Sequence, residues 1–180
     1  MSVRRDDKYI RYGQEYRLLK QEGFTPFDPT GYGFKLKSVN TACEKGYWCE
    51  YKVENYGIFL DKLYICCDDG NYPTVNGKTY DTKEDGTPVE CEGCRVYSNI
   101  GLNLANSCDI VIGKDSIVDP GMHDAFLPYG YKTLREIIFK DGKNIHEINW
   151  DDEIERIRKI RNGDKHAKAY KKEHWWLNEK

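Results

Sequence analysis

The residues with the most definite chemistry are Cys91 and Cys94, which stand two residues apart in the stretch PVECEGCRVYS. A tight turn at this spacing brings two sulfurs within reach of one zinc ion. The same spacing occurs in redox pairs, which sit at a helix N-terminus whose dipole lowers the pKa of the thiol. Here Glu90 and Glu92 flank the cysteines and the strand-like RVYSNI follows them, so the sequence disfavours a redox pair.

A structural zinc site would need two further ligands. The other cysteines offer Cys66 with Cys67, or Cys43 with Cys49, and neither pair repeats the two-residue spacing of a paired knuckle. Adjacent residues of a strand also point to opposite faces of its sheet. We therefore expect Cys91 and Cys94 to be reduced, partly buried thiols that bind no cofactor. A zinc site that includes them is the alternative.

Catalysis by a nucleophile would need a base, and the best placed histidine is His123 in the segment DPGMHDAFLPYGY. Asp124 follows it, and Cys43 or Cys108 could supply a thiol. Adjacency in sequence is weak support, because such sites are assembled in space. The chain contains no G-x-S-x-G, Walker, H-E-x-x-H or G-x-G-x-x-G motif. An enzyme or small-ligand binder that uses the His123 loop is therefore an alternative function.

An acidic stretch follows at residues 68 to 95, where Asp-Gly and Asn-Gly dipeptides indicate tight turns. We expect a loop or hairpin-rich excursion whose acids contact a partner: Asp68, Asp69, Asp81, Glu84 and Asp85.

Residues 156 to 180 carry the opposite charge, with nine basic against three acidic side chains. Tyr170, Trp175 and Trp176 are interleaved with them. This composition suits a nucleic-acid backbone or an acidic protein groove. The alternative is a solvated helix face whose indoles dock on the sheet, and we expect docking of at least one of the two tryptophans, because paired exposed indoles form a costly apolar patch.

Two stretches resemble a family of uncharacterised bacterial proteins, over about residues 34 to 143. The first is NTACEKGYWCEYKVENYGIFLDKLYICC, and the second is CDIVIGKDSIVDPGMHDAFLPYGYKTLREIIFKDGK. The resemblance implies a β-rich fold and no assigned activity. The matching residues of the first stretch are Thr41, Ala42, Cys43, Gly46, Tyr47, Leu63, Tyr64 and Ile65.

The elements that must position these residues are mainly strands. Clusters of β-formers predict strands in YWCEYKV, KLYICC and CDIVIG, and a hairpin in TLREIIFKDGKNIHEI with Asp141-Gly142 as its turn. Residues 8 to 40 predict short strands and turns.

A C-terminal helix is predicted in WDDEIERIRKIR, because isoleucines recur at steps of three, acids open the segment and bases close it. The fold class is therefore α+β: a mostly antiparallel curled sheet, or partial barrel, with a C-terminal helix. We expect residues 1–148 to form a β-rich domain and residues 149–180 to pack on it, as a single domain overall.

The totals of the 180-residue chain fit a globular protein, with 39% hydrophobic and 32% charged residues. The 28 basic and 30 acidic side chains give no global field that would attract nucleic acid or lipid. The N-terminal residues include no apolar stretch of the kind found in a secretory signal peptide. No stretch of apolar residues approaches the length needed to span a membrane. We expect a cytoplasmic protein with reduced thiols and no membrane partner.

Segregated charge without a recognisable catalytic constellation favours a protein-binding role. We expect a small module of bacterial or phage origin, like an immunity protein or inhibitor, that blocks a protein partner through its acidic loop and exposed aromatic residues. Nucleic-acid contact through residues 156–180 is the third hypothesis, after the enzyme.

Overall fold

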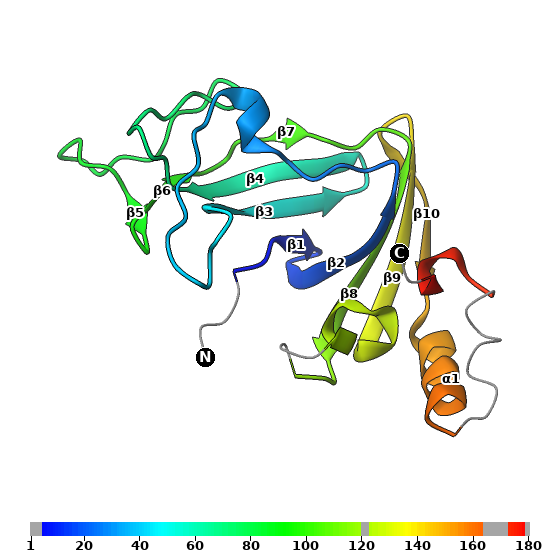
Figure 1. The fold of residues 1–180 in the computed structure, drawn as a ribbon. Coiled ribbons are helices and arrows are strands. Elements are labelled where there is room, and N and C mark those ends of the chain that lie inside the picture. Colours follow the sequence, from blue (N-terminus) through cyan, green and yellow to red (C-terminus); the bar gives the residue numbers. More distant parts are fainter. Residues whose placement is uncertain (1–4, 120–122, 164–172, 179–180) are drawn as a thin grey trace. The chain divides into compact units, whose positions relative to one another are not determined.

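The structure is a computed structural model that describes residues 5–119, 123–163 and 173–178. Most of the regular secondary structure is β-strand, and the strands form a mostly antiparallel sheet that does not close on itself (Figure 1). An α-helix follows the strands near the C-terminus. The predicted α+β class is confirmed. Within the described ranges, no helix has the length and apolar character needed to span a bilayer.

The chain divides into two compact units. Unit 1 comprises the described residues up to Gln14 together with Thr25–Ala105, and unit 2 comprises Glu15–Phe24 and the described residues from Asn106 onward. These boundaries differ from the expected division after residue 148. The organisation as a single domain stays a prediction.

The unit 1 sheet has the strand order β1-β3-β4-β6-β5, and β7 also pairs with β4. β1 and β3 run parallel, and the other pairs are antiparallel. The strands are β1 (Lys8–Arg11), β3 (Tyr47–Glu54), β4 (Gly57–Ile65), β5 (Glu90–Cys91), β6 (Cys94–Tyr97) and β7 (Leu102–Asn103).

The β3–β4 hairpin forms the centre of unit 1 and confirms the predicted strands at YWCEYKV and KLYICC. Tyr51 and Val53 of β3 and Leu60 of β4 are buried. β4 begins at Gly57, earlier than the cluster of β-formers indicated. Gly57 has φ 158°, and a Cβ there would lie 2.6 Å from the Oδ1 atom of the Asn103 side chain, so any larger residue would have to displace that side chain.

The unit 2 sheet is antiparallel, with the strand order β10-β9-β8-β2. Asp141 and Gly142 both have positive φ, which is the two-residue turn that the sequence predicted between β9 and β10. A register shift between Asn144 and His146 leaves Ile145 unpaired in the β9–β10 ladder and 51% exposed. The strands are β2 (Gln14–Glu22), β8 (Cys108–Ser116), β9 (Tyr131–Lys140) and β10 (Lys143–Asn149).

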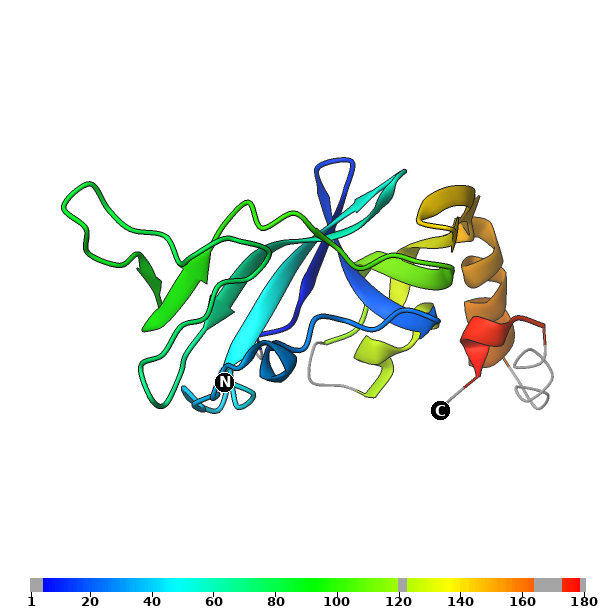
Figure 2. The ribbon, with the colours of Figure 1, turned by 90° about the horizontal axis from the view of Figure 1, so that it is seen from above.

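Helix α1 (Asp151–Asn162) confirms the predicted C-terminal helix and ends at Gly163. The Asp151 carboxylate accepts hydrogen bonds from the Leu134 backbone N–H and from Arg135, and these bonds fix the start of α1 to β9. A short 3-10 helix, η5 (Trp175–Leu177), lies beside α1 (Figure 2). Together they cover one face of the unit 2 sheet, and their shared core contains Val111, Leu127, Tyr129, Leu134, Ile154, Ile157, Trp176 and Leu177.

Within the described residues, further short 3-10 helices interrupt the loops: η1 (Pro29–Tyr32) in unit 1, and η2 (His123–Phe126) and η3 (Pro128–Gly130) in unit 2. The acidic stretch contains the isolated bridges Val75↔Lys78 and Thr82↔Pro88, in agreement with the predicted hairpin-rich excursion.

Candidate functional sites

The acidic side chains predicted to contact a partner mainly hold their own loop together. Asp69 Oδ1 accepts the Asn71 N–H at 3.0 Å, and this bond lowers the pKa of Asp69. Asp85 Oδ1 accepts the hydroxyl and N–H of Thr87, which lower the pKa of Asp85 in the same way. Asp81 accepts the Ser98 hydroxyl.

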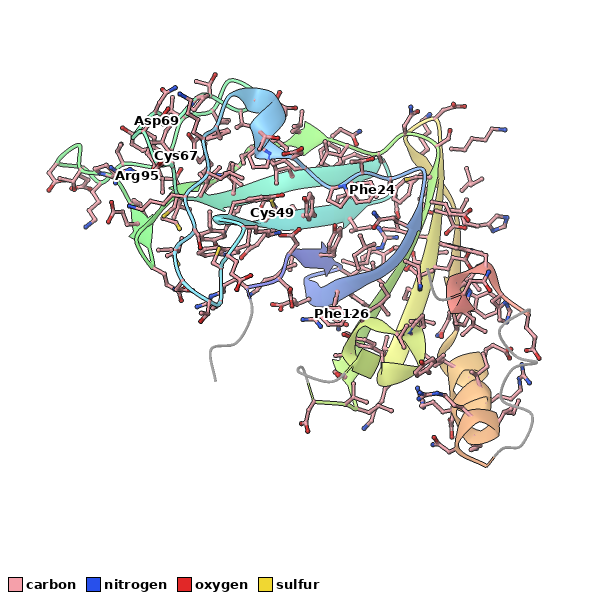
Figure 3. All side chains as sticks on the ribbon, in the orientation of Figure 1. Phe24, Cys49, Cys67, Asp69, Arg95 and Phe126 are labelled. Carbon is pink, nitrogen blue, oxygen red and sulfur yellow. The ribbon has the colours of Figure 1, made fainter. Side chains whose placement is uncertain are left out.

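The remaining two acids of this set, Asp68 and Glu84, are exposed, as are Asp69 and Asp85. The acidic loop leaves β4 at Ile65, at the end of the β3–β4 hairpin opposite to its Glu54–Gly57 turn. Cys67, Asp69 and Arg95 mark this end of the sheet (Figure 3). The loop therefore offers few acids that do not already serve its local turns.

The tail places its tryptophans in the core rather than on a binding surface. Trp176 is 0% exposed, so the expectation that it contacts a partner is wrong in this structure, and the expected docking of at least one indole is confirmed. Trp175 is half-buried and donates its indole N–H to Glu136 at 2.8 Å. Tyr170 lies outside the described residues.

The arginines of α1 are engaged within unit 2. Arg156 pairs with Glu153 and Glu173. Arg158 donates to the Tyr131 carbonyl at 2.5 Å, and the Arg161 guanidinium lies 3.9 Å from the centroid of the Tyr129 ring. The described part of residues 156–180 therefore gives no added support to nucleic-acid contact.

The residues of the alternative catalytic site are distributed over both units. η2 begins at His123, and the side chains of His123 and Asp124 lie outside the described part of the structure. Cys108 is buried on β8 of unit 2, whereas Cys43 belongs to unit 1. The described side chains therefore give this site no geometry.

A carboxylate pair in unit 2, formed by the buried Glu136 and the half-buried Asp109, was not anticipated from the sequence. Glu136 of β9 accepts the indole N–H groups of Trp150 at 2.7 Å and Trp175 at 2.8 Å. Asp109 of β8 lies beside it, and burial together with a hydrogen bond to Glu136 raises the pKa of Asp109. The signal in the sequence was an acid within each apolar strand, Asp109 near the start of β8 and Glu136 inside β9. The arrangement ties β9 to the segments before and after α1.

An aromatic turn surface is the other arrangement that the sequence did not indicate, and we define it by Tyr12, Tyr56 and Phe59. Tyr12 is 71% exposed and Tyr56 is 65% exposed. Tyr56 packs edge-on against Phe59, with ring centroids 5.3 Å apart. Because β1 and β3 are parallel, the turns after these strands lie next to one another. This places Tyr12 and Tyr56 on adjacent turns.

A buried arginine holds both turns. Arg11 is 1% exposed and donates to the Val53 carbonyl at 3.0 Å and to Asn55 Oδ1 at 2.8 Å. It also donates to the Tyr12 hydroxyl at 2.9 Å, and its guanidinium carbon lies 4.2 Å from the centroid of the Tyr12 ring. Tyr12 and the following Gly13 both have positive φ, as tight hairpin turns require.

A thiol cluster occupies the opposite end of unit 1, and we define it by Cys43, Cys66, Cys91 and Cys94. These residues pack together with Trp48 and Tyr64. The Sγ atoms of Cys66 and Cys94 lie 2.7 Å apart, and all the cysteines are reduced. Burial raises the pKa of both Cys43 and Cys94.

No family model, curated protein or solved structure matches this chain. The resemblance of residues 34 to 143 to an uncharacterised bacterial family stays a prediction. Functional conclusions about this chain depend on its own geometry.

Proposed function

We propose that the chain is a cytosolic protein-binding module, like an immunity protein or inhibitor, that blocks a partner with its aromatic turn surface. The observation that carries this proposal is the pair of exposed tyrosines held on adjacent turns by the buried Arg11. Tyrosine is enriched at protein interfaces, where its ring is buried and its hydroxyl still finds a hydrogen-bond partner.

The rigidity of the turns is what distinguishes these tyrosines from scattered surface aromatics. A side chain that is ordered before binding loses little conformational entropy when a partner covers it. The contacts of Tyr12 with Arg11 and of Tyr56 with Phe59 supply such order. The surface is therefore suited to act as a small cluster of binding hot spots.

The acidic loop supports this role less than the sequence indicated. It lies at the opposite end of the β3–β4 hairpin from the aromatic turns, so one compact epitope cannot include both. We assign the acidic loop a secondary role in the rate of association. Exposed charges outside the contact surface raise the rate at which a partner associates more than they raise the affinity of the complex.

The test is to capture a partner from the source cell with the wild-type chain, purify it, and measure its Kd for variants. Truncation of a hot-spot aromatic costs roughly 2 kcal/mol, so Tyr12→Ala and Tyr56→Ala should each raise Kd about 30-fold. Tyr32→Ala is the matched control, because Tyr32 is 41% exposed and lies on η1.

Two outcomes would reject the proposal. If the wild-type chain retains no protein, the binding role is wrong. If a partner binds the Tyr12 and Tyr56 variants as tightly as the wild type, the assigned surface is wrong even though the binding role stands.

A further inference from the structure

We propose that the thiol cluster of unit 1 is a zinc site, in which the Sγ atoms of Cys43, Cys66, Cys91 and Cys94 are the four ligands. Four cysteines form the ligand set that zinc prefers in structural sites. Three separate segments of the chain deliver them to one place, and Trp48 and Tyr64 pack around them.

The β5–β6 hairpin supplies the first two ligands. Cys91 and Cys94 face each other across the strand pair. Glu92 and Gly93 form the turn between them with φ 51° and 81°, so both sulfurs hang from the same tight hairpin. Cys66 Sγ lies 3.1 Å from the Gly93 carbonyl oxygen, directly against this turn.

The other two ligands come from a second tight turn and the chain that crosses it. The Gly46 N–H donates to the Cys43 carbonyl at 3.3 Å, which closes a Cys43–Gly46 turn. Gly46 has φ 78°, and a Cβ there would lie 2.5 Å from the Lys37 carbonyl oxygen, so this turn requires glycine. The Cys66 N–H donates to the Gly46 carbonyl at 2.9 Å. In a C-x-x-C knuckle that began at Cys43, the second cysteine would stand at position 46. Gly46 occupies that position here, and Cys66 is hydrogen-bonded to it from the neighbouring chain segment.

This geometry explains why spacing alone did not reveal the site. The sequence offered Cys66 with Cys67, or Cys43 with Cys49, and the cluster takes one cysteine from each pair. The Cys67 N–H donates to the Tyr72 hydroxyl, and Cys67 forms a bridge with Leu36. Cys49 is buried within β3, away from the cluster.

Zinc binding would require the four thiols to rearrange from their positions in the structure. A zinc ion with bonds of about 2.3 Å holds its sulfurs roughly 3.8 Å apart. Among the described residues, no three thiol sulfurs all lie within 4.8 Å of one another, whereas the Cys66 and Cys94 sulfurs are closer than the ideal. The proposed site therefore requires thiols of the cluster to rotate about their Cα–Cβ bonds when zinc binds.

The surroundings suit a site with excess negative charge. Zinc with four thiolates carries a net charge of about −2, because each thiol gives up its proton on binding. The Cys66 N–H donates to the Gly46 carbonyl beside the cluster, and the Arg5 guanidinium carbon lies 5.8 Å from the centroid of the Trp48 ring, which packs in the cluster. Hydrogen bonds and cations of this kind are the usual outer-shell support of a metal ligand.

The direct test is metal analysis of the purified chain under reducing conditions, followed by titration of the demetallated chain with Co²⁺. We expect one zinc per chain, and one equivalent of Co²⁺ should give thiolate charge-transfer bands and tetrahedral d–d bands. Cys43→Ser and Cys94→Ser should abolish stoichiometric binding. Cys67→Ser and Cys108→Ser are the matched controls and should retain it.

A second readout covers variants that fail to fold. The wild-type chain is treated with an alkylating reagent with and without Zn²⁺, and the modified cysteines are identified by mass spectrometry. Protection by Zn²⁺ should be confined to the four cluster residues. A reduced chain that binds neither metal overturns the proposal, as does a chain whose cluster contains only a Cys66–Cys94 disulfide. Metal binding that depends on Cys67 or Cys108 would also overturn it.

Discussion

Arg11 links two turns of unit 1 through a single buried guanidinium. Its acceptors are the Val53 carbonyl, Asn55 Oδ1 and the Tyr12 hydroxyl. An arginine is the side chain best suited to this task, because its planar group carries five donors in a fixed geometry. Arg11 thus fixes the Tyr12 side chain and the turn that carries Tyr56, although Arg11 itself is only 1% exposed.

Replacement of this arginine should affect both stability and binding. Arg11→Ala leaves the buried Val53 carbonyl without this donor and should lower the free energy of unfolding by about 3 kcal/mol. Arg11→Lys keeps the charge but cannot reach three acceptors, so we expect an intermediate loss. Urea denaturation measures both variants. Equal stability of Arg11→Ala and the wild type would show that the turns do not depend on this residue.

The pair of the half-buried Asp109 and the buried Glu136 should make the stability of the protein depend on pH. The folded state raises the pKa of Asp109 from 3.8 to about 8, chiefly through burial and secondly through its hydrogen bond to Glu136. The folded state therefore holds this proton more tightly than the unfolded chain does. Its contribution favours folding below about pH 4 and is lost as the pH rises towards 8.

Asp109→Asn should remove this pH dependence, because the amide stays neutral. The unfolding free energy of the variant, relative to the wild type, should increase between pH 5 and pH 9 in urea titrations. Asp68→Asn, on the exposed acidic loop, is the control and should run parallel to the wild type. A wild-type curve that matches Asp109→Asn at every pH would contradict the assignment.

At the scale of elements, α1 and η5 are joined by contacts that lie outside regular secondary structure. The imidazole of His174 stacks on Trp176 with centroids 4.8 Å apart, and its Nε2 atom lies 3.1 Å from Glu153 Oε1. Trp176 itself packs among Ile154, Ile157 and Leu134. η5 therefore acts as a second apolar layer over the unit 2 sheet.

Loss of this indole should be costly. Trp176→Ala removes a fully buried side chain from the core and should lower the unfolding free energy by roughly 3–5 kcal/mol. Trp176→Phe should cost less, because phenylalanine keeps most of the apolar contact and the Trp176 indole N–H has no hydrogen-bond partner in the described residues. Thermal and urea unfolding followed by near-UV circular dichroism measure both. Similar losses in the two variants would contradict this reasoning.

The elements could be predicted where local pattern decides the structure. The β-formers of β3 and β8, the Asp141–Gly142 turn and the isoleucine spacing of α1 each specify their own segment. The sites could not be predicted, because they depend on pairings between distant segments. The parallel register of β1 with β3 creates the aromatic turn surface, and the Cys66–Gly46 hydrogen bond brings Cys66 to the Cys43 turn.

At the scale of the whole molecule, the described residues include one apolar cluster in unit 2 and a smaller cluster of thiols and aromatic rings in unit 1. Unit 2 has a continuous apolar core under α1 and η5. The loop-rich end of unit 1 has only a small cluster of thiols and aromatic rings. Small cores of this kind gain most from a metal ion, because its binding free energy adds directly to folding.

The bulge at Ile145 has a consequence for crowded solutions. β10 is the terminal strand of the unit 2 sheet, and such an edge can recruit the same edge of another molecule into a growing cross-β aggregate. The irregular register interrupts the flat row of backbone groups that this recruitment needs. The protein can thereby keep a long hairpin at its periphery without offering a template for fibres.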